Sequence, residues 1–284
     1  MVKKQVLFPD GHSVPAIGQG TWYMGERNSD TVSEARALQY GLDLGLSLID
    51  TAEMYADGGA EKVVGQAIRG RRDDVFLVSK VYPQHAGGQQ AAIACENSLR
   101  RLQTDSIDLY LLHWRGGVPL SDTIAAMEQL QRDGKIKRWG VSNLDVADME
   151  ELWSLPGGNA CMTDQVLYHL ASRGIEFDLL PWCRQRSLPV MAYCPLAQAG
   201  NLRNGLMEHQ QVRDIAHELG VTVAQVLLAW AIARPGVIAI PKAASRDHVK
   251  ENADALAVEL NEAQLQALDN AFPAPARKTH LDIV

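Results

Sequence analysis

The chain has 284 residues, of which 46% are hydrophobic and 21% are charged, and its formal net charge is −7. This composition is typical of a soluble globular protein, and the acidic balance disfavours nucleic acid or an anionic membrane as a partner. The length fits one large α/β barrel or two ordinary domains. The N-terminal residues lack the apolar segment of a secretory signal, and the longest apolar runs are too short to span a bilayer.

The cysteines also narrow the class of protein. There are four of them, and no two have the CxxC spacing that is common in zinc and redox sites. The pattern therefore predicts neither a metal site nor a disulfide framework. A reduced protein in the cytoplasm is the simplest interpretation.

The first fifty residues predict a hairpin, a short strand and a helix. Two short apolar segments flank Pro9-Asp10-Gly11-His12, which indicates a β-hairpin with Asp-Gly at its turn. A glycine-rich strand is expected at Ile17–Gly20. The pattern Thr31-x-x-Glu34 is that of a capping box, and apolar residues with helical spacing then continue to a stop at Gly45.

From Leu46 onwards, short apolar segments alternate with amphipathic helical ones. The expected strands are Ile17–Gly20, Leu46–Asp50, Val75–Lys80, Ile107–His113, Arg138–Ser142, Cys161–Gln165, Pro189–Tyr193 and Val237–Pro241. The expected helices are Thr31–Gly45, Glu61–Arg69, Gln89–Leu102, Leu120–Asp133, Asp145–Trp153, Asp178–Ser187, Glu208–Leu219, Thr222–Ala233, Arg246–Ala253 and Asn261–Phe272.

This alternation predicts a parallel sheet with helices outside it. Eight strands over this length, with no linker rich in Pro, Gly or Ser, predict a single α/β domain over residues 1–284. We expect a (β/α)8 TIM barrel with an N-terminal β-hairpin and extra helices near the C-terminus. An open doubly wound sheet is the alternative, and it is disfavoured because no GxGxxG motif follows the first strand.

In such a barrel the active site lies at the carboxyl ends of the strands. Each residue there has an ordinary structural explanation, and a lone histidine in particular is more often a core residue than a functional one. Together they are harder to dismiss, because the fold places them around one cavity. The residues at or just beyond the expected strand ends are Asp50, Lys80, His113, Ser142, Asn143, Gln165, Tyr193, Pro241 and Lys242.

Tyr55 follows Asp50 in the next loop, and the two suggest proton chemistry. A free tyrosine has a pKa of about 10. The Lys80 ammonium beside it would favour the phenolate and lower that pKa. Asp50 would pair with Lys80, while His113 would donate a hydrogen bond to a carbonyl oxygen. The set suits carbonyl reduction, with hydride from a nicotinamide because no side chain can supply one.

Several longer motifs carry the same residues, and together they cover nearly the whole chain. They are Leu48–Tyr55, Val78–Lys80, Ile107–Trp114, Gly140–Asn143, Tyr193–Leu196, Ile240–Lys242 and Glu251-Asn252. In content, order and spacing they resemble the aldo-keto reductase family. Within it, Gly18–Gly25 and Pro195–Gly200 resemble the bacterial reductases of methylglyoxal and similar aldehydes.

The resemblance implies roles for individual residues. The catalytic tetrad would be Asp50, Tyr55, Lys80 and His113, with Tyr55 as the acid in reduction. Tyr193 would stack on the nicotinamide ring. Ser142, Asn143 and Gln165 would bind the carboxamide group of the nicotinamide.

The resemblance also implies contacts along the rest of the cofactor and with the substrate. Lys242 would pair with the 2′-phosphate of NADPH, and Glu251 and Asn252 would meet the adenine. The backbone that follows the cofactor would be Gly20, Thr21, Trp22, Cys194, Pro195 and Leu196. The substrate pocket would be walled by Trp22, Tyr82 and Trp114.

The chain departs from the family pattern at three positions near the expected cofactor. Cys194 and Ala243 stand where serine is usual, and His248 stands where arginine is common. A bidentate arginine–phosphate contact would be replaced at His248 by at most one partly charged donor. We therefore expect NADPH to be preferred, with NADH as an alternative cofactor. The short tail, residues 273–284, predicts an open substrate pocket.

The sequence therefore predicts a monomeric reductase of small carbonyl compounds, and two other functions are alternatives to it. One is a regulatory subunit that binds the cofactor and turns over slowly, like those attached to ion channels. The chain has no extension that resembles a docking segment for such a role. The other is a Schiff-base lyase that uses Lys80. Pairing with Asp50 disfavours the lyase, because it keeps the amine protonated and non-nucleophilic.

Overall fold

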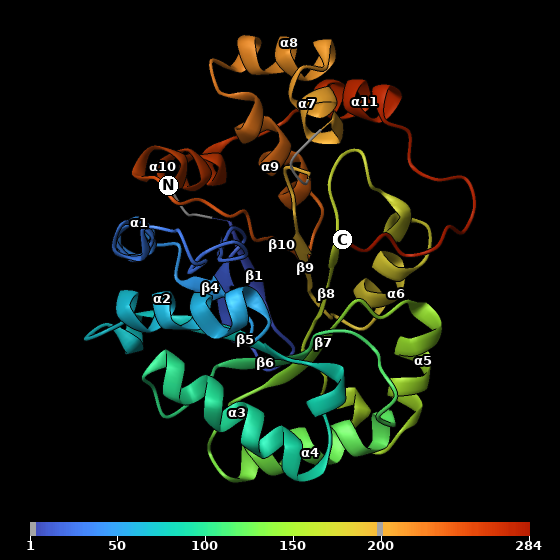
Figure 1. The fold of residues 1–284 in the computed structure, drawn as a ribbon. Coiled ribbons are helices and arrows are strands. Elements are labelled where there is room, and N and C mark those ends of the chain that lie inside the picture. The colour runs from blue at the N-terminus through green and yellow to red at the C-terminus, as the bar shows by residue number, and fades with distance from the viewer. Residues whose placement is uncertain (1–3, 198–200) are drawn as a thin grey trace.

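The computed structural model describes residues 4–197 and 201–284 of the chain, and its centre is a sheet of eight parallel strands (Figure 1). Bridges from Ile17 to Ala239 and from Gly20 to Lys242 join the first strand region to the last, which closes the sheet. The predicted (β/α)8 barrel is therefore confirmed. The strands, in spatial order around it, are β3 (Gln19–Gly20), β4 (Leu48–Asp50), β5 (Phe76–Val81), β6 (Leu109–Leu112), β7 (Trp139–Ser142), β8 (Asp164–Leu167), β9 (Val190–Tyr193) and β10 (Val237–Ala239).

Alternation along the strands decides which side chains enter the barrel. On β6, Leu109 and Leu111 belong to the hydrophobic cluster inside the barrel, whereas Tyr110 and Leu112 belong to the cluster under the outer helices. The inner cluster also contains Leu48 and Val78. Residues two positions further along each strand share that inward face, and these are Asp50, Lys80 and His113. Strand periodicity alone therefore directs three polar side chains to the same interior.

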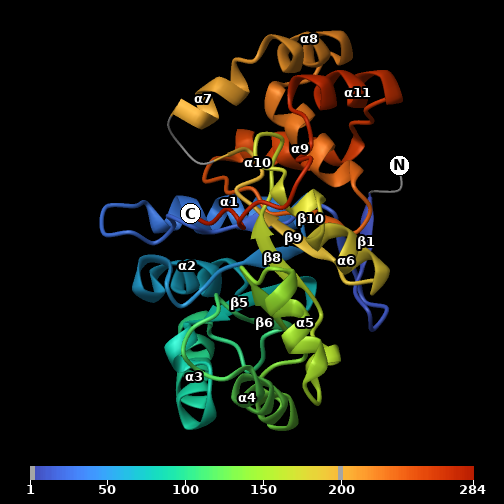
Figure 2. The same cartoon turned by 90° about the vertical axis from the view of Figure 1, so that its right-hand side faces the viewer.

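The N-terminal hairpin closes the other end of the barrel. β1 (Gln5–Leu7) pairs with β2 (Ser13–Pro15) around a turn in which Gly11 has a φ of 84°, as the Asp-Gly motif predicts. Phe8 stacks on Phe76 of β5, with 5.1 Å between the ring centroids. Figure 2 shows the hairpin at one end of the molecule, with α7 and the C-terminal tail at the other.

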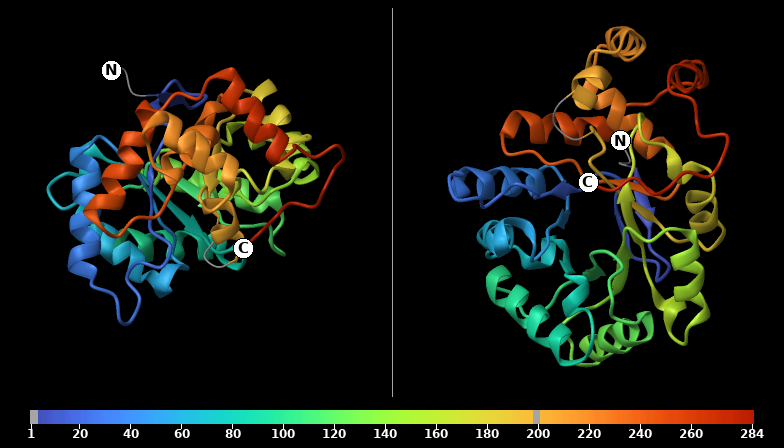
Figure 3. Two further views of the ribbon diagram at one scale, coloured as in Figure 1. Left: turned by 90° about the horizontal axis from the view of Figure 1, so that it is seen from above. Right: turned by 45° about the vertical axis from the view of Figure 1, so that its right-hand side comes forward.

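Helices surround the barrel, and three of them, α7, α8 and α11, lie outside the regular alternation. Figure 3 shows α8 and α11 stacked beyond α9 on the outside of the barrel. The helices are α1 (Thr31–Asp43), α2 (Gly59–Ala67), α3 (Gly88–Leu102), α4 (Leu120–Arg132), α5 (Val146–Ser154), α6 (Leu179–Gln185), α7 (Asn201–Met207), α8 (Gln210–Leu219), α9 (Val223–Ala233), α10 (Arg246–Asp254) and α11 (Glu262–Ala271).

Two local predictions are wrong. Asp30, not Thr31, caps α1 by accepting from the Ser33 amide, and Glu34 accepts from the Gly25 amide instead of closing a capping box. β8 begins at Asp164, three residues later than predicted, because its register with β9 pairs Asp164 with Val190.

Helix α7 was also not predicted. It is a seven-residue helix that contains glycine, and it has too few apolar residues for a periodic signal. Among the described residues no single helix is long and apolar enough to cross a membrane. Helices α8 and α9 together have the length and composition of a membrane span, but the pair is sharply bent between them.

The register of β8 places an unusual acid outside the barrel. Asp164 shares the outward face with Val166 and is fully buried. Within the described part of the chain, neither of its oxygens has a hydrogen-bond partner of ordinary geometry. Burial raises the pKa of Asp164 well above 3.8, and the Leu144 amide offsets part of this shift. The folded protein therefore keeps the proton at a pH at which the unfolded chain has lost it.

We expect Asp164→Asn to stabilise the protein increasingly as pH rises. The unfolded Asp164 ionises near pH 4, so the wild type loses about 1.4 kcal/mol per pH unit above that value until the folded carboxyl also ionises. Asparagine has nearly the same shape and carries no such penalty. Urea unfolding midpoints at pH 4 and pH 7 measure the difference. The matched control, Asp73→Asn, removes an exposed carboxyl, and an Asp164→Asn gain that is equal at both pH values would contradict the prediction.

Candidate active site

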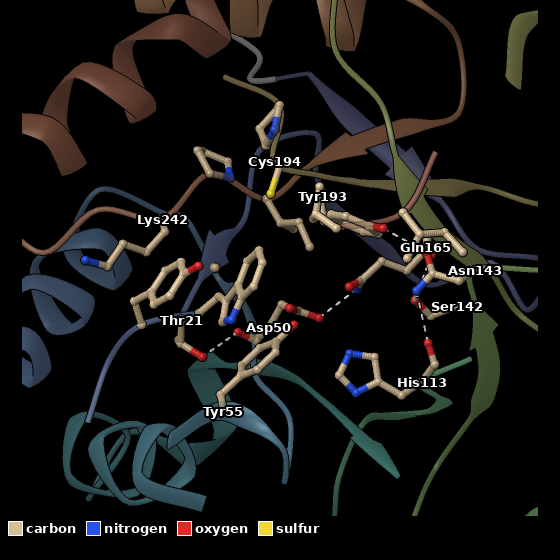
Figure 4. Close-up of a pocket in the computed structure, with 18 of the residues that line it drawn as sticks. Thr21, Asp50, Tyr55, His113, Ser142, Asn143, Gln165, Tyr193, Cys194 and Lys242 are labelled. Carbon is tan, nitrogen blue, oxygen red and sulfur yellow. Dashed lines mark hydrogen bonds between the residues drawn. The ribbon is translucent and has the colours of Figure 1, made fainter. Parts of the chain in front are cut away.

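A cavity of about 560 Å³ opens at the carboxyl ends of the strands (Figure 4). Its size is in the range of small-molecule sites. Most of the site residues predicted from the strand ends or implied by the family resemblance border it. They are Gly20, Thr21, Trp22, Asp50, Tyr55, His113, Trp114, Ser142, Asn143, Gln165, Tyr193, Cys194, Pro195, Leu196 and Lys242.

Lys80 lies beneath the cavity floor and is completely buried. Its Nζ lies 2.7 Å from Asp50 Oδ2, 2.9 Å from the Thr51 carbonyl oxygen and 3.0 Å from the Tyr55 hydroxyl. These three acceptors match the three protons of an ammonium group. Burial lowers the pKa of Lys80, and the Asp50 carboxylate opposes that shift. The geometry is that of a protonated lysine held by three partners.

Asp50 is held from both sides. Its Oδ2 pairs with Lys80, and its Oδ1 accepts a hydrogen bond of 2.7 Å from Nε2 of Gln165. Gln165 comes from β8, on the far side of the barrel interior, so the contact links strands that are distant in the sheet. The amide nitrogen of Gln165 must face Asp50, because a carboxylate can only accept hydrogen bonds. The Oε1 atom of Gln165 is therefore the part left for a ligand.

Tyr55 differs from its prediction in one respect. Burial raises the pKa of Tyr55 well above 10, and the negative charge of Asp50 adds to the shift. The predicted lowering of the Tyr55 pKa by Lys80 is therefore wrong, because burial and Asp50 together disfavour the phenolate. Tyr55 is a neutral phenol at physiological pH, and it can donate its proton while Lys80 donates to its oxygen.

His113 is a neutral imidazole. Burial lowers the pKa of His113 to about 2, with a further contribution from the positive charge of Lys80. The ring meets the Tyr55 ring edge-on, with 5.8 Å between the centroids. Its Nδ1 is buried and has no hydrogen-bond partner in the described structure. A neutral ring of this kind can donate one N–H without carrying charge into the cavity.

Asn143 joins two walls of the cavity. Its Nδ2 donates to the His113 carbonyl oxygen at 3.2 Å, and its Oδ1 accepts from the Tyr193 hydroxyl at 2.8 Å (Figure 4). Its backbone has a φ of 59°, which non-glycine residues rarely adopt. Tyr23, Cys194 and Ala197 also have positive φ and also border the cavity. Backbone in such conformations gathers at functional sites, where the surrounding structure holds it.

Some predicted residues do not border the cavity. Tyr82 lies one layer back, packed edge-on against Trp114 with 5.8 Å between the centroids. His248, Glu251 and Asn252 lie on α10: His248 is exposed and Asn252 is buried beside Pro241 and Ala243. Their predicted contacts with the cofactor stay predictions.

Pro241, which was expected at the end of the last strand, also borders the cavity. Other residues border it without having been predicted, and these are Tyr23, Met54, Arg115, Ala197, Arg203, Ile240, Ile283 and Val284. Tyr23, Met54 and Arg115 are each adjacent in the sequence to a predicted site residue. That adjacency could have identified them as candidates for the cavity wall. No sequence pattern marks Arg203. Ile283 and Val284 from the tail also border the cavity, and the predicted open substrate pocket stays a prediction. Among the described residues no cluster of three or more His, Cys, Asp or Glu side chains could hold a metal ion.

Comparison with known proteins agrees with this geometry. The model of the aldo/keto reductase family matches residues 16–272. The chain belongs to the aldo/keto reductase family. It is 64% identical over all 284 residues to a protein of Escherichia coli K12 named methylglyoxal reductase YeaE, and the match covers 100% of both chains.

Solved structures of the family agree closely. An aldo/keto reductase from Klebsiella pneumoniae in complex with NADP and acetate has a TM-score of 0.97 and 63% identity. A second Klebsiella structure, in complex with NADPH, has a TM-score of 0.97 and 64% identity. Each match covers 100% of both chains.

We expect the His113 ring to stay neutral throughout the physiological pH range, because its pKa is lowered to about 2. NMR of histidine-labelled protein measures this directly, with the His113 signal assigned by its loss in His113→Asn. Its chemical shift should not change between pH 5 and 8. Free histidine, which titrates near a pKa of about 6.5, is the reference. A His113 shift that follows the reference curve would contradict the prediction.

Proposed function

We propose that this protein is an NADPH-dependent reductase that converts small aldehydes and ketones, including dicarbonyls such as methylglyoxal, to alcohols. One observation carries the proposal. The Lys80 ammonium donates one hydrogen bond to Asp50 and another to the Tyr55 hydroxyl. Tyr55 in turn borders the cavity beside the neutral His113. The names of the Escherichia coli relative and of the Klebsiella complexes support the same substrate class and cofactor.

The groups around the cavity suit a nicotinamide dinucleotide. Tyr193 presents an aromatic ring, and the free Oε1 of Gln165 lies near it as an acceptor for an amide. Lys242 lies across the cavity from Tyr193 in Figure 4, and its ammonium group can pair with a phosphate. A reduced nicotinamide bound here supplies the hydride that no side chain can provide.

The protein residues then direct the proton and the developing charge. A carbonyl oxygen placed between Tyr55 and His113 accepts hydrogen bonds from the phenol and from the imidazole N–H. As negative charge grows on that oxygen, Tyr55 transfers its proton to it. Lys80 stabilises the phenolate that remains, because its Nζ already donates to the Tyr55 oxygen at 3.0 Å. Asp50 keeps Lys80 protonated and oriented throughout.

The cavity walls favour a small, largely apolar carbonyl compound. Trp22, Trp114 and Met54 are among the wall residues, and Ile283 and Val284 border the same cavity. Removal of reactive aldehydes is the physiological role that this chemistry suggests. A cytoplasmic location and a monomeric state stay predictions from the sequence.

The alternative functions receive less support from the site. A Schiff-base lyase needs an unprotonated lysine that meets the substrate, whereas Lys80 is buried below the floor with all its protons engaged. A slow regulatory subunit would share this geometry. Steady-state turnover distinguishes it from the proposed reductase. A panel of carbonyl compounds assayed with NADPH and NADH tests the proposal, and the absence of turnover with every compound would overturn it.

We expect Tyr55→Phe to abolish carbonyl reduction while cofactor affinity stays close to that of the wild type. Phenylalanine keeps the ring and removes only the proton donor, a role worth roughly 10²- to 10⁴-fold in rate. Steady-state NADPH oxidation with methylglyoxal gives the rate, and fluorescence titration gives the affinity. Normal turnover in this variant would rule out the mechanism.

We expect His248→Arg to tighten the binding of NADPH and leave that of NADH unchanged. Arginine restores a charged fork that can bind the 2′-phosphate in a bidentate manner, and NADH has no such phosphate. Dissociation constants for both cofactors provide the measurement. An equal change in the two constants would show that His248 does not lie near the 2′-phosphate.

A further inference from the structure

The cavity wall has an excess of positive charge in an otherwise acidic protein. Three cationic side chains border the cavity, namely Arg115, Arg203 and Lys242. The one carboxylate side chain among its described wall residues is Asp50, which is already paired with Lys80. A local excess of cations in a protein of net charge −7 indicates a site for an anion.

The charge of Arg115 is already satisfied. Its Nη1 lies 2.9 Å from Asp148 and 2.6 Å from Glu151, and its Nη2 lies 2.9 Å from the other Glu151 oxygen. In residues 4–197 and 201–284 no carboxylate lies within ion-pair distance of Arg203 or Lys242. These two cations are therefore the ones available to a ligand.

The proposed cofactor brings more negative groups than Lys242 can meet. NADPH carries a 2′-phosphate, which is assigned to Lys242, and a pyrophosphate between its two nucleosides. The residues predicted to follow that central part, Gly20 to Trp22 and Cys194 to Leu196, are all uncharged. A pyrophosphate left with backbone partners alone would lack a counter-charge within the cavity.

Arg203 borders the same cavity, and it comes soon after the residues predicted to follow the central part of the cofactor. The wall residues run without a break from Tyr193 to Ala197, and Arg203 follows on helix α7, half-buried and bordering the same cavity. The helix stands at the barrel mouth (Figure 2), and the buried side chain of Leu206 anchors it to the rest of the fold. In Figure 4, Tyr193 and Lys242 lie on opposite sides of the cavity, with Cys194 between them.

We propose that Arg203 is a cofactor-binding residue that pairs with the pyrophosphate of the dinucleotide. A guanidinium binds phosphate oxygens in a bidentate manner and stays charged at every physiological pH. The inference rests on the proposed function, because it needs a dinucleotide in the cavity. It assigns to Arg203 the phosphate that NADPH and NADH share, and leaves to Lys242 the one that only NADPH has.

Direct binding to four proteins tests this assignment: the wild type, Arg203→Gln, Lys242→Met and the control Arg213→Gln. Arg213 is an exposed arginine on the neighbouring helix α8, and it does not border the cavity. Each protein is titrated with NADPH and with NADH, and the quenching of tryptophan fluorescence gives the dissociation constant. Thermal midpoints show whether each variant is folded.

Arg203→Gln should weaken both cofactors by the same factor, roughly ten- to hundred-fold for one charge-assisted contact. Lys242→Met should weaken NADPH alone, and Arg213→Gln should change neither constant. Unchanged constants in folded Arg203→Gln would overturn the proposal. So would weakening of NADPH alone, which would move Arg203 to the 2′-phosphate.

A substrate role for Arg203 is the remaining alternative. It would leave both dissociation constants unchanged and raise the KM only for an aldehyde that also carries a carboxylate, and that result would likewise overturn the proposal. A wild-type protein that binds neither dinucleotide would instead refute the proposed function.

Discussion

A single buried ammonium group organises this active site. Placing Lys80 in the barrel interior costs several kcal/mol of hydration free energy, which only well-placed partners can offset. Asp50 provides the charge, and the Thr51 carbonyl and Tyr55 hydroxyl complete the shell. All three partners come from β4 or the segment just after it, next to β5, which carries Lys80. The lysine therefore sets the position of the phenol, and the phenol sets where a carbonyl oxygen can react.

The fold and the centre of the site could be predicted because strand periodicity governs both. The same alternation that buries Leu48 and Val78 inside the barrel sends Asp50 and Lys80 inward two residues later. Residues at the strand ends were therefore placed correctly from spacing alone. The family resemblance then suggested chemical roles that spacing could not provide.

The parts that the sequence did not reveal depend on contacts between distant segments. The Gln165 amide meets Asp50 across the barrel, so its partner could not be inferred from local sequence. The pKa of Tyr55 depends on the balance between burial and neighbouring charges, which needs coordinates. The Asp30 cap displaced the expected capping box because Glu34 has a better partner in the Gly25 amide. Helix α7 is too short to leave a periodic pattern, and Arg203 was missed with it.

Closure of the barrel has a consequence for how the protein reaches its working form. The seam pairs Ile17 with Ala239 and Gly20 with Lys242, and most of the chain lies between the two partners. At Gly20 a side chain would meet the Ile240 carbonyl oxygen at 2.7 Å, so the seam depends on glycine there. Because residues on both sides of the seam border the cavity, no N-terminal fragment contains a complete binding site. During synthesis on the ribosome, the nascent chain therefore gains its dinucleotide pocket only after Lys242 has emerged.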